Sequence, residues 1–325
     1  MLRIALHLAF ATLVAQTGPA QAQDWPTRPM SMVVPFAAGG PVDVLGRILA
    51  QHLSEVAGKQ VVVENITGAG GMTGSLRVSQ GEPDGHLFVL GSIGTHALNQ
   101  TLYKKPLYNA ATDFAPVALV ADVPLVLITR KDFPADDLPS FVAYAKTSHS
   151  KMQYGSGGTG TSAHIGCVLL NQAMGVDVTH IPYRGGGPAM ADLLAGRIDY
   201  LCNIASTAVP AIENKSVKAL ATLSRERTPV LPDLATAHEQ GLRNFDAYTW
   251  NAIFLPKAAP AAIVGKLNAA LVQVMNRPAF VERLQKVGLM VVAPERRGPD
   301  YLRQFVESEI EKWAAPIKAS GAREE

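Results

Sequence analysis

The sequence is poor in cysteine and in charge. Among its 325 residues there are two cysteines, Cys167 and Cys202, which are too few for a disulfide-rich scaffold and lack the Cys/His spacing of a zinc site. Charged residues make up 17% of the chain, with 29 basic against 27 acidic residues and no long Lys/Arg run. Nucleic-acid-binding faces are strongly basic, so this balance argues against a nucleic-acid partner.

Long apolar runs are also scarce, although 48% of the residues are hydrophobic. Beyond the N-terminus, no segment reaches the roughly 20 apolar residues that span a bilayer without charges, Pro or Gly. The apolar fraction is instead enough for a large core, which excludes disorder, and the length predicts about two domains of roughly 100–200 residues.

Residues 1–22 have the pattern of a cleaved secretory signal peptide. Arg3 gives a short positive start, residues 4–15 are apolar, and Ala20 and Ala22 supply the small residues that signal peptidase reads. We therefore expect an exported, periplasmic protein. In that compartment Cys167 and Cys202 either pair or stay free and buried, and the sequence leaves both alternatives open.

Short β-rich runs alternate with helical patterns, which predicts an α/β fold with mainly parallel sheets. The first unit lacks closing helices of its own, and the helices near the C-terminus lack a sheet. We therefore expect a discontinuous domain 1 (23–123 plus 247–325) and an inserted domain 2 (124–246). Two crossing segments, 122–124 and 248–250, would form a hinge that faces a ligand cleft.

Four Gly-rich loops follow predicted strands, at 35–43, 91–95, 155–162 and 184–188. The first N–H groups of a helix are unpaired and carry the positive end of its dipole, so they hold an anion without a charged side chain. Such loops meet at the carboxyl ends of parallel strands, where open α/β sheets bind ligands. The alternative is that each glycine only permits a tight turn. Taken as a set, the loops predict a shared anion site.

The pattern Gly155-x-Gly157-x-x-Gly160 matches a dinucleotide fingerprint, but the confirming acidic residue is misplaced. Asp177 has about the right separation, yet it begins the next predicted strand instead of ending it. We therefore expect no nucleotide cofactor.

Catalytic and metal-binding patterns are likewise weak. Ser162 and His164 are two residues apart at the start of one helix, so they do not face each other, and no Gly-x-Ser-x-Gly elbow is present. The histidines show no metal-ligand spacing. A hydrolase or isomerase with His164 as base remains a rival hypothesis, but it lacks a partner that would orient the imidazole.

Three further side chains have two interpretations each. Asn203 follows a predicted strand and either lies beside the cleft or caps the following helix. Tyr183 and Trp250 either line the ligand site or pack at the hinge.

The same loops carry the motifs of a known family. The sequence resembles the Bug family, the substrate-binding receptors of tripartite tricarboxylate transporters, over essentially the whole mature chain. The matching motifs are Trp25-Pro26-x-Arg28-Pro29, Val33-Val34-Pro35-Phe36-Ala37-x-Gly39-Gly40-x-x-Asp43, Gly68-Ala69-Gly70-Gly71, Tyr154-Gly155-x-x-Gly158-x-Gly160-x-x-x-His164 and His180-Ile181-Pro182-Tyr183-Arg184-Gly185-x-Gly187-Pro188.

The resemblance implies a two-lobed periplasmic binding protein of type II-like fold, not an enzyme, that delivers a small carboxylate to membrane permease subunits. We expect it to be a monomer. The resemblance places the following residues at the ligand or close to it: Phe36, Ala37, Gly39, Gly40, Ser92, Thr95, Thr159, Thr161, Ser162, His164 and Asn203. The candidate ligand residues also include Gly158 of the same loop, and Tyr183 and Trp250 in the first of their two interpretations.

Two positions depart from the family pattern. Pro41 replaces a small residue, and Asn203 stands where many members have Asp. Without that acidic group a substrate ammonium loses its natural partner, so we expect a dicarboxylate rather than an amino acid. A tricarboxylate or an aromatic acid, and a role in sensing instead of uptake, remain alternatives.

Overall fold

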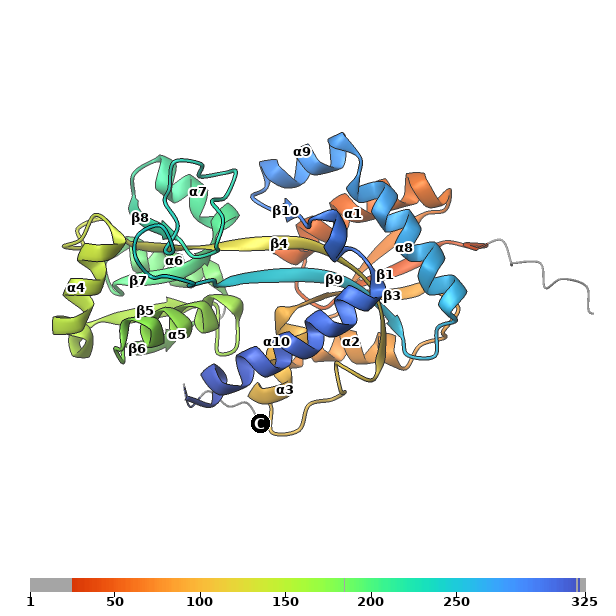
Figure 1. Ribbon diagram of the computed structural model, residues 1–325, viewed down its shortest axis with the longest axis horizontal. Helices are drawn as coiled ribbons and strands as arrows, with labels where there is room; N and C mark the ends of the chain where they lie inside the picture. The colour runs from red at the N-terminus through yellow and green to blue at the C-terminus, as the bar shows by residue number, and fades with distance from the viewer. Residues whose placement is uncertain (1–24, 184, 320, 322–325) are drawn as a thin grey trace, which may run out of the picture.

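The computed structural model describes residues 25–183, 185–319 and 321. The predicted signal peptide, 1–22, lies outside the described residues. Two lobes lie at opposite ends of the long axis, and two long strands run between them (Figure 1). One ten-stranded mixed sheet passes through both lobes. No helix in the described part of the chain is long and apolar enough to cross a membrane.

The first lobe begins with the predicted alternation of strands and helices. β1 pairs in parallel with β2 and with β3, and α1 starts with Pro41 at a position that needs no N–H donor. Its early elements are β1 (Met30–Val34), α1 (Pro41–Ala57), β2 (Val61–Asn65), η1 (Ala69–Gly71), α2 (Met72–Ser79), β3 (Leu87–Ser92), η2 (Gly94–Leu98) and α3 (Asn99–Leu102).

The second lobe repeats the pattern in the middle of the chain. β5 pairs in parallel with β6 and β7, so the loops after these strands meet at one edge of the sheet. Its elements are α4 (Leu138–Ser148), η3 (His149–Lys151), β5 (Gln153–Ser156), α5 (Ser162–Met174), β6 (Thr179–Pro182), α6 (Gly186–Leu194), β7 (Tyr200–Ile204), α7 (Ala205–Glu213) and β8 (Val217–Thr222).

Two strands connect the lobes. The 17-residue β4 (Phe114–Arg130) pairs antiparallel with β9 (Tyr248–Pro256), and Val123 lies opposite Thr249 between the lobes. β8 and β7 also run antiparallel to β4. The expectation of mainly parallel sheets is therefore wrong for the centre of the molecule. The physical reason is topological, because the chain enters the second lobe along β4 and returns along β9.

The last segment of the chain covers the first lobe (Figure 1). It contributes side chains such as Leu271, Phe280 and Trp313 to the same core as β1 and β3. Its elements are α8 (Ala261–Met275), α9 (Pro278–Lys286), β10 (Met290–Val291), η4 (Pro294–Arg296) and α10 (Pro299–Ala319). Two other cores draw almost wholly on residues between Leu125 and Ala247. This separation supports our proposal that the domains are 23–123 plus 247–325 and 124–246.

Candidate functional site

A cavity of about 770 Å³ lies between the lobes. The loops after β1 and β3 line it from the first lobe, and the loops after β5 and β6 together with β7 and the start of α7 line it from the second. No charged side chain is among the described residues that line it. Its polar lining side chains are Ser92, Asn99, Tyr103, Ser156, Thr159, Thr161, Ser162, Asn203, Thr207, Thr249 and Asn251. Within the described ranges, no three His, Cys, Asp or Glu side chains lie together as a metal site.

Three helices begin at this cavity. Gly40 precedes α1, Thr161 precedes α5 and Gly185 precedes α6, and all three residues line the cavity. Neither Gly40 nor Gly185 has a side chain to bond the unpaired N–H groups of the first turn. Those groups and the helix dipoles favour an anion, and none of the described lining residues is Lys or Arg.

The loop before α1 is fixed by two buried or half-buried polar side chains. Asp43 accepts a hydrogen bond from Gly39 N at 2.8 Å and another from Asn65 Nδ2 at 2.9 Å. Asn65 Nδ2 also donates to the carbonyl oxygen of Phe36 at 3.0 Å. The carboxylate of Asp43 therefore holds the loop from behind and leaves Phe36 and Gly40 facing the cavity.

Ser92 is held by the turn that follows β3. Thr95 Oγ1 accepts a hydrogen bond from Ser92 N at 2.9 Å and lies 2.8 Å from His96 Nδ1. Thr95 is fully buried, and its own carbonyl accepts a hydrogen bond from Tyr108 OH at 2.7 Å. Ser92 lines the cavity, whereas Thr95 lies behind it as a support.

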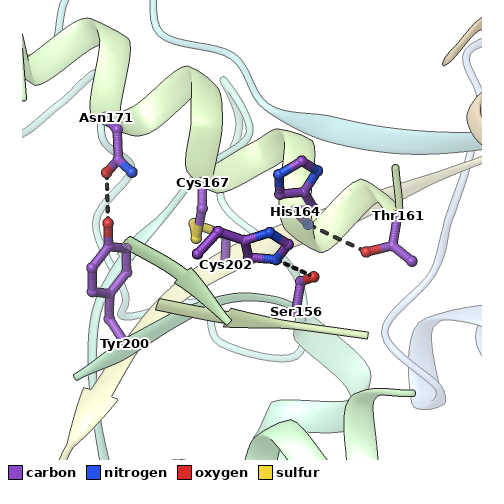
Figure 2. The surroundings of a disulfide bond; sticks show 8 residues. Ser156, Thr161, His164, Cys167, Asn171, Tyr200 and Cys202 are labelled. Atoms are coloured by element: carbon purple, nitrogen blue, oxygen red, sulfur yellow. Dashed lines mark hydrogen bonds between the residues drawn. A yellow bond between two sulfur atoms is a disulfide. The ribbon is translucent and has the colours of Figure 1, made fainter. Parts of the chain in front are cut away.

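Two stacked histidines, His164 and His180, support the loop before α5. Figure 2 shows His164 beside Thr161, whose hydroxyl accepts its backbone N–H. The rings of His164 and His180 are 4.0 Å apart, and His180 Nε2 lies 2.8 Å from Ser156 Oγ. His164 Nδ1 accepts a hydrogen bond from Gly160 N at 3.2 Å. Burial lowers the pKa of His164 to about 3 and that of His180 to about 4. Both rings are therefore neutral at ordinary pH and serve the loop as packing and hydrogen-bonding groups.

A disulfide connects two elements of the cavity wall (Figure 2). It joins Cys167 of α5 to Cys202 of β7, and both residues are fully buried. The sequence leaves open whether the two cysteines pair or stay free and buried, and in the structure they are paired. Ser162 lies on the same helix as Cys167, and Asn203 directly follows Cys202, so the bond ties two cavity-lining residues into one unit.

The structure places half of the candidate ligand residues on the cavity. Those that line it are Phe36, Gly40, Ser92, Thr159, Thr161, Ser162 and Asn203. Those that it places outside the lining are Ala37, Gly39, Thr95, Gly158, His164, Tyr183 and Trp250.

For two aromatic side chains the structure favours the packing interpretation. Trp250 is fully buried and its Nε1 donates to Glu309 Oε2 at 2.9 Å. The Tyr183 hydroxyl donates to Asp192 Oδ2 at 2.8 Å. Ala37 and Gly39 are exposed to solvent at the outer side of their loop.

The sequence did not lead us to predict that polar side chains of β9 line the cavity. Thr249 and Asn251 line the cavity on either side of Trp250 in the sequence. Successive side chains of a strand point to opposite faces, so the two polar residues face the cavity while Trp250 faces the core. Asn251 is nevertheless almost fully buried, and its Nδ2 donates to the Gly91 carbonyl at 3.2 Å. The sequence pattern that could have predicted this is the presence of two polar residues, two positions apart, in an otherwise apolar strand.

The lobes touch each other beside the cavity. A Cβ atom added at Gly160 of the second lobe would lie 2.0 Å from Leu102 Cδ2 of the first. Gly160 also has a φ of +76°, which side chains rarely adopt. A glycine is therefore required where the two lobes approach around the cavity.

Solved structures with the same architecture identify the class of protein. The periplasmic binding protein BugD is 37% identical, with a TM-score of 0.79 over 93% of this chain and all of that chain. MatC from Rhodopseudomonas palustris with bound malate is 38% identical, with a TM-score of 0.79 over 90% of this chain and 99% of that one. The R. palustris protein Rpa4515 with adipate is 30% identical, with a TM-score of 0.82 over 92% and 99%. The fold with its cavity between lobes is that of a periplasmic binding protein.

The family is shown by a sequence model as well. Residues 45–322 match the model of the tripartite tricarboxylate transporter family receptor. BugT from Bordetella pertussis is 32% identical over 98% of this chain and 97% of its own length. The chain therefore belongs to the TctC/Bug family of tripartite tricarboxylate transporter receptors. This is a family of binding proteins, not of enzymes.

Proposed function

We propose that the protein is an exported receptor that binds a small organic carboxylate between its lobes and delivers it to the membrane subunits of a tripartite tricarboxylate-type transporter. The observation that carries the proposal is the convergence of three helix N-termini on a cavity whose described lining has no charged side chain. The relatives with bound malate and adipate are consistent with a carboxylate ligand. The predicted signal peptide supports the periplasmic location.

Within the carboxylates, a dicarboxylate is the proposed class. Asn203 lines the cavity, and no carboxylate is among the described residues beside it. A buried ammonium group loses its hydration, and without an acidic partner no ion pair offsets that loss, so an amino acid is disfavoured. Dicarboxylic acids lack that group.

Ligand binding would stabilise the closed arrangement of the lobes. The candidate ligand groups come from both lobes, with Gly40 and Ser92 on one side and Thr159 and Ser162 on the other. These groups converge on one anion only when the lobes are together, so the ligand binds the closed form more tightly and shifts the population toward it.

A thermal-shift screen of mono-, di- and tricarboxylates and of aromatic acids tests this function. A ligand at about 100 times its Kd adds about 2.7 kcal/mol to the free energy of unfolding, which raises the melting temperature. Ser162→Ala should weaken binding about tenfold, because a hydrogen bond to a charged group contributes about 1.5 kcal/mol or more. Gly40→Val should weaken it further by obstructing approach to the first turn of α1.

Ser308→Ala is the matched control, since Ser308 is exposed on α10 and bonds only the carbonyl of its own helix. It should leave both affinity and stability unchanged. Full affinity in Ser162→Ala and Gly40→Val would contradict the site assignment. Tight binding of aspartate or glutamate without binding of dicarboxylic acids would contradict the proposed ligand class.

A further inference from the structure

One face of α6 lies along the cavity and is apolar. Gly187, Met190, Ala191 and Leu194 recur at intervals of three and four residues, and all four line the cavity. At 1.5 Å per residue, this face runs about 10 Å away from the N-terminus of the helix. The cavity therefore continues from the anion-stabilising end of α6 along a surface of carbon atoms.

Leu194 is unusual in its exposure. It is 50% exposed, and the other large hydrophobic side chains of the described chain that are exposed are Val62 and Leu107. Of these three, Leu194 alone lines the cavity. A ligand that covers apolar surface inside a binding cavity is bound more tightly, because removing that surface from water contributes about 25 cal/mol per Å² to the binding free energy.

Other apolar residues extend this surface. Leu201 and Ile204 come from β7, and Leu289 comes from the loop after α9 in the first lobe. The backbone next to Leu289 packs tightly against the second lobe, since a Cβ atom at Gly288 would lie 2.8 Å from Ser206 Cβ. Met190, Leu194, Leu201, Ile204 and Leu289 are together called the apolar wall.

The apolar wall has no group that could pair with a polar ligand atom. The described residues of the cavity include no Lys, Arg, Asp or Glu. The hydroxyl and amide groups lie on other residues, and the one that adjoins the wall, the Thr207 hydroxyl on α7, donates to the Ile204 carbonyl at 2.9 Å. A ligand hydroxyl placed on the wall would lose its hydration without a replacement hydrogen bond, which costs free energy. A methylene or ring carbon in the same place would strengthen binding, because its apolar surface would be removed from water.

We propose that the apolar wall receives the hydrocarbon body of the ligand, so that the receptor selects carboxylates with an unhydroxylated chain or ring over short hydroxylated acids. The inference rests on the proposed carboxylate function and specifies the ligand further. One carboxylate binds at the helix N-termini, and the carbon chain lies along α6 from Gly187 toward Leu194.

Calorimetric titration with straight-chain α,ω-dicarboxylates of four to eight carbons tests the inference. The affinity of the wild-type protein should rise up to about fourfold with each added methylene until the wall is covered. Tartrate, which carries two hydroxyl groups, should bind more weakly than succinate, which has the same chain without them. Leu194→Gln should lower the affinity for suberate about tenfold and leave that for succinate within twofold.

Leu107→Gln is the matched control, because Leu107 is 45% exposed and lies away from the cavity lining. It should bind every acid as the wild type does. A flat chain-length series, or tartrate binding at least as tightly as succinate, would overturn the role of the wall even if Leu194→Gln failed to fold. The absence of binding for every carboxylate would instead refute the proposed function itself.

Discussion

Replacing both Cys167 and Cys202 with alanine is expected to lower the free energy of unfolding by about 4 kcal/mol. The bond closes a loop with a sequence separation of 35 residues, which contains β6, the loop before α6 and α6 itself. Crosslinking removes conformations from the unfolded chain, and for a loop of this length the loss amounts to about 4 kcal/mol. Urea unfolding followed by circular dichroism measures the change directly.

Reduction of the wild-type protein provides the control for this substitution. The sequence has two cysteines, so a reductant that reaches the unfolded chain acts on this bond alone. Unfolding under reducing conditions should therefore shift the urea midpoint of the wild type toward that of the double variant. The double variant itself should not respond to reductant. Two titratable thiols in the non-reduced, unfolded wild type would contradict the disulfide.

Loss of the bond should also affect the cavity. Cys202 directly precedes Asn203, and Cys167 lies on the helix whose first residue is Ser162. Gly166 fixes the same helix against the sheet, since a Cβ atom there would lie 2.6 Å from Leu125 Cδ1. Packing therefore keeps α5 near its place, and we expect a modest fall in affinity beside the large fall in stability.

Much of the fold follows from local patterns in the sequence. The helix beginning at Pro41 and the glycine turns after β1, β3 and β5 were predicted because each depends on residues adjacent in the chain. The antiparallel pairing of β4 with β9 was not, because those strands lie more than 100 residues apart and their apolar runs carry no sign of direction. Register and direction are set by tertiary pairing.

The residues of the candidate site also differ in whether neighbouring or distant parts of the chain determine where they lie. Small and hydroxyl residues of the loops, such as Gly40 and Ser162, line the cavity because the loop position itself determines where they lie. The hydrogen-bond partner of the buried Trp250 is Glu309, 59 residues away, and no local pattern contains that partner. The apolar wall was not predicted as part of the site for a different reason. Met190 and Leu194 have the spacing of an ordinary core-facing helix.

The protein should lose stability steeply as the pH falls from 8 to 5. Burial lowers the pKa of His96 to about 3 and, with a contribution from the neighbouring His180, that of His164 to about 3. Burial also lowers the pKa of His180 to about 4. Between these values and the ordinary pKa of about 6.5, the unfolded chain binds protons that the folded protein does not. Each of the three histidines therefore costs about 2 kcal/mol at pH 5, or about 6 kcal/mol together.

The surroundings of His96 explain why it stays neutral. Its ring stacks on Phe254 with centroids 3.8 Å apart, and Phe114 lies 4.7 Å away. Thr95 Oγ1 lies 2.8 Å from Nδ1, and His96 Nε2 has no hydrogen-bond partner among the residues that the structure describes. An imidazolium in this aromatic pocket would be desolvated without an opposite charge, so protonation is coupled to unfolding.

Urea unfolding of His96→Gln at pH 8 and pH 5 isolates this contribution. Whatever its stability at pH 8, the variant should lose about 4 kcal/mol between the two pH values where the wild type loses about 6. Burial raises the pKa values of Asp122 and Asp246, which favours the folded state as the pH falls, but the wild type and the variant share that effect. His149→Gln, at a partly exposed histidine, should keep the full pH dependence. Equal pH dependence in the wild type and His96→Gln would show that His96 is not responsible.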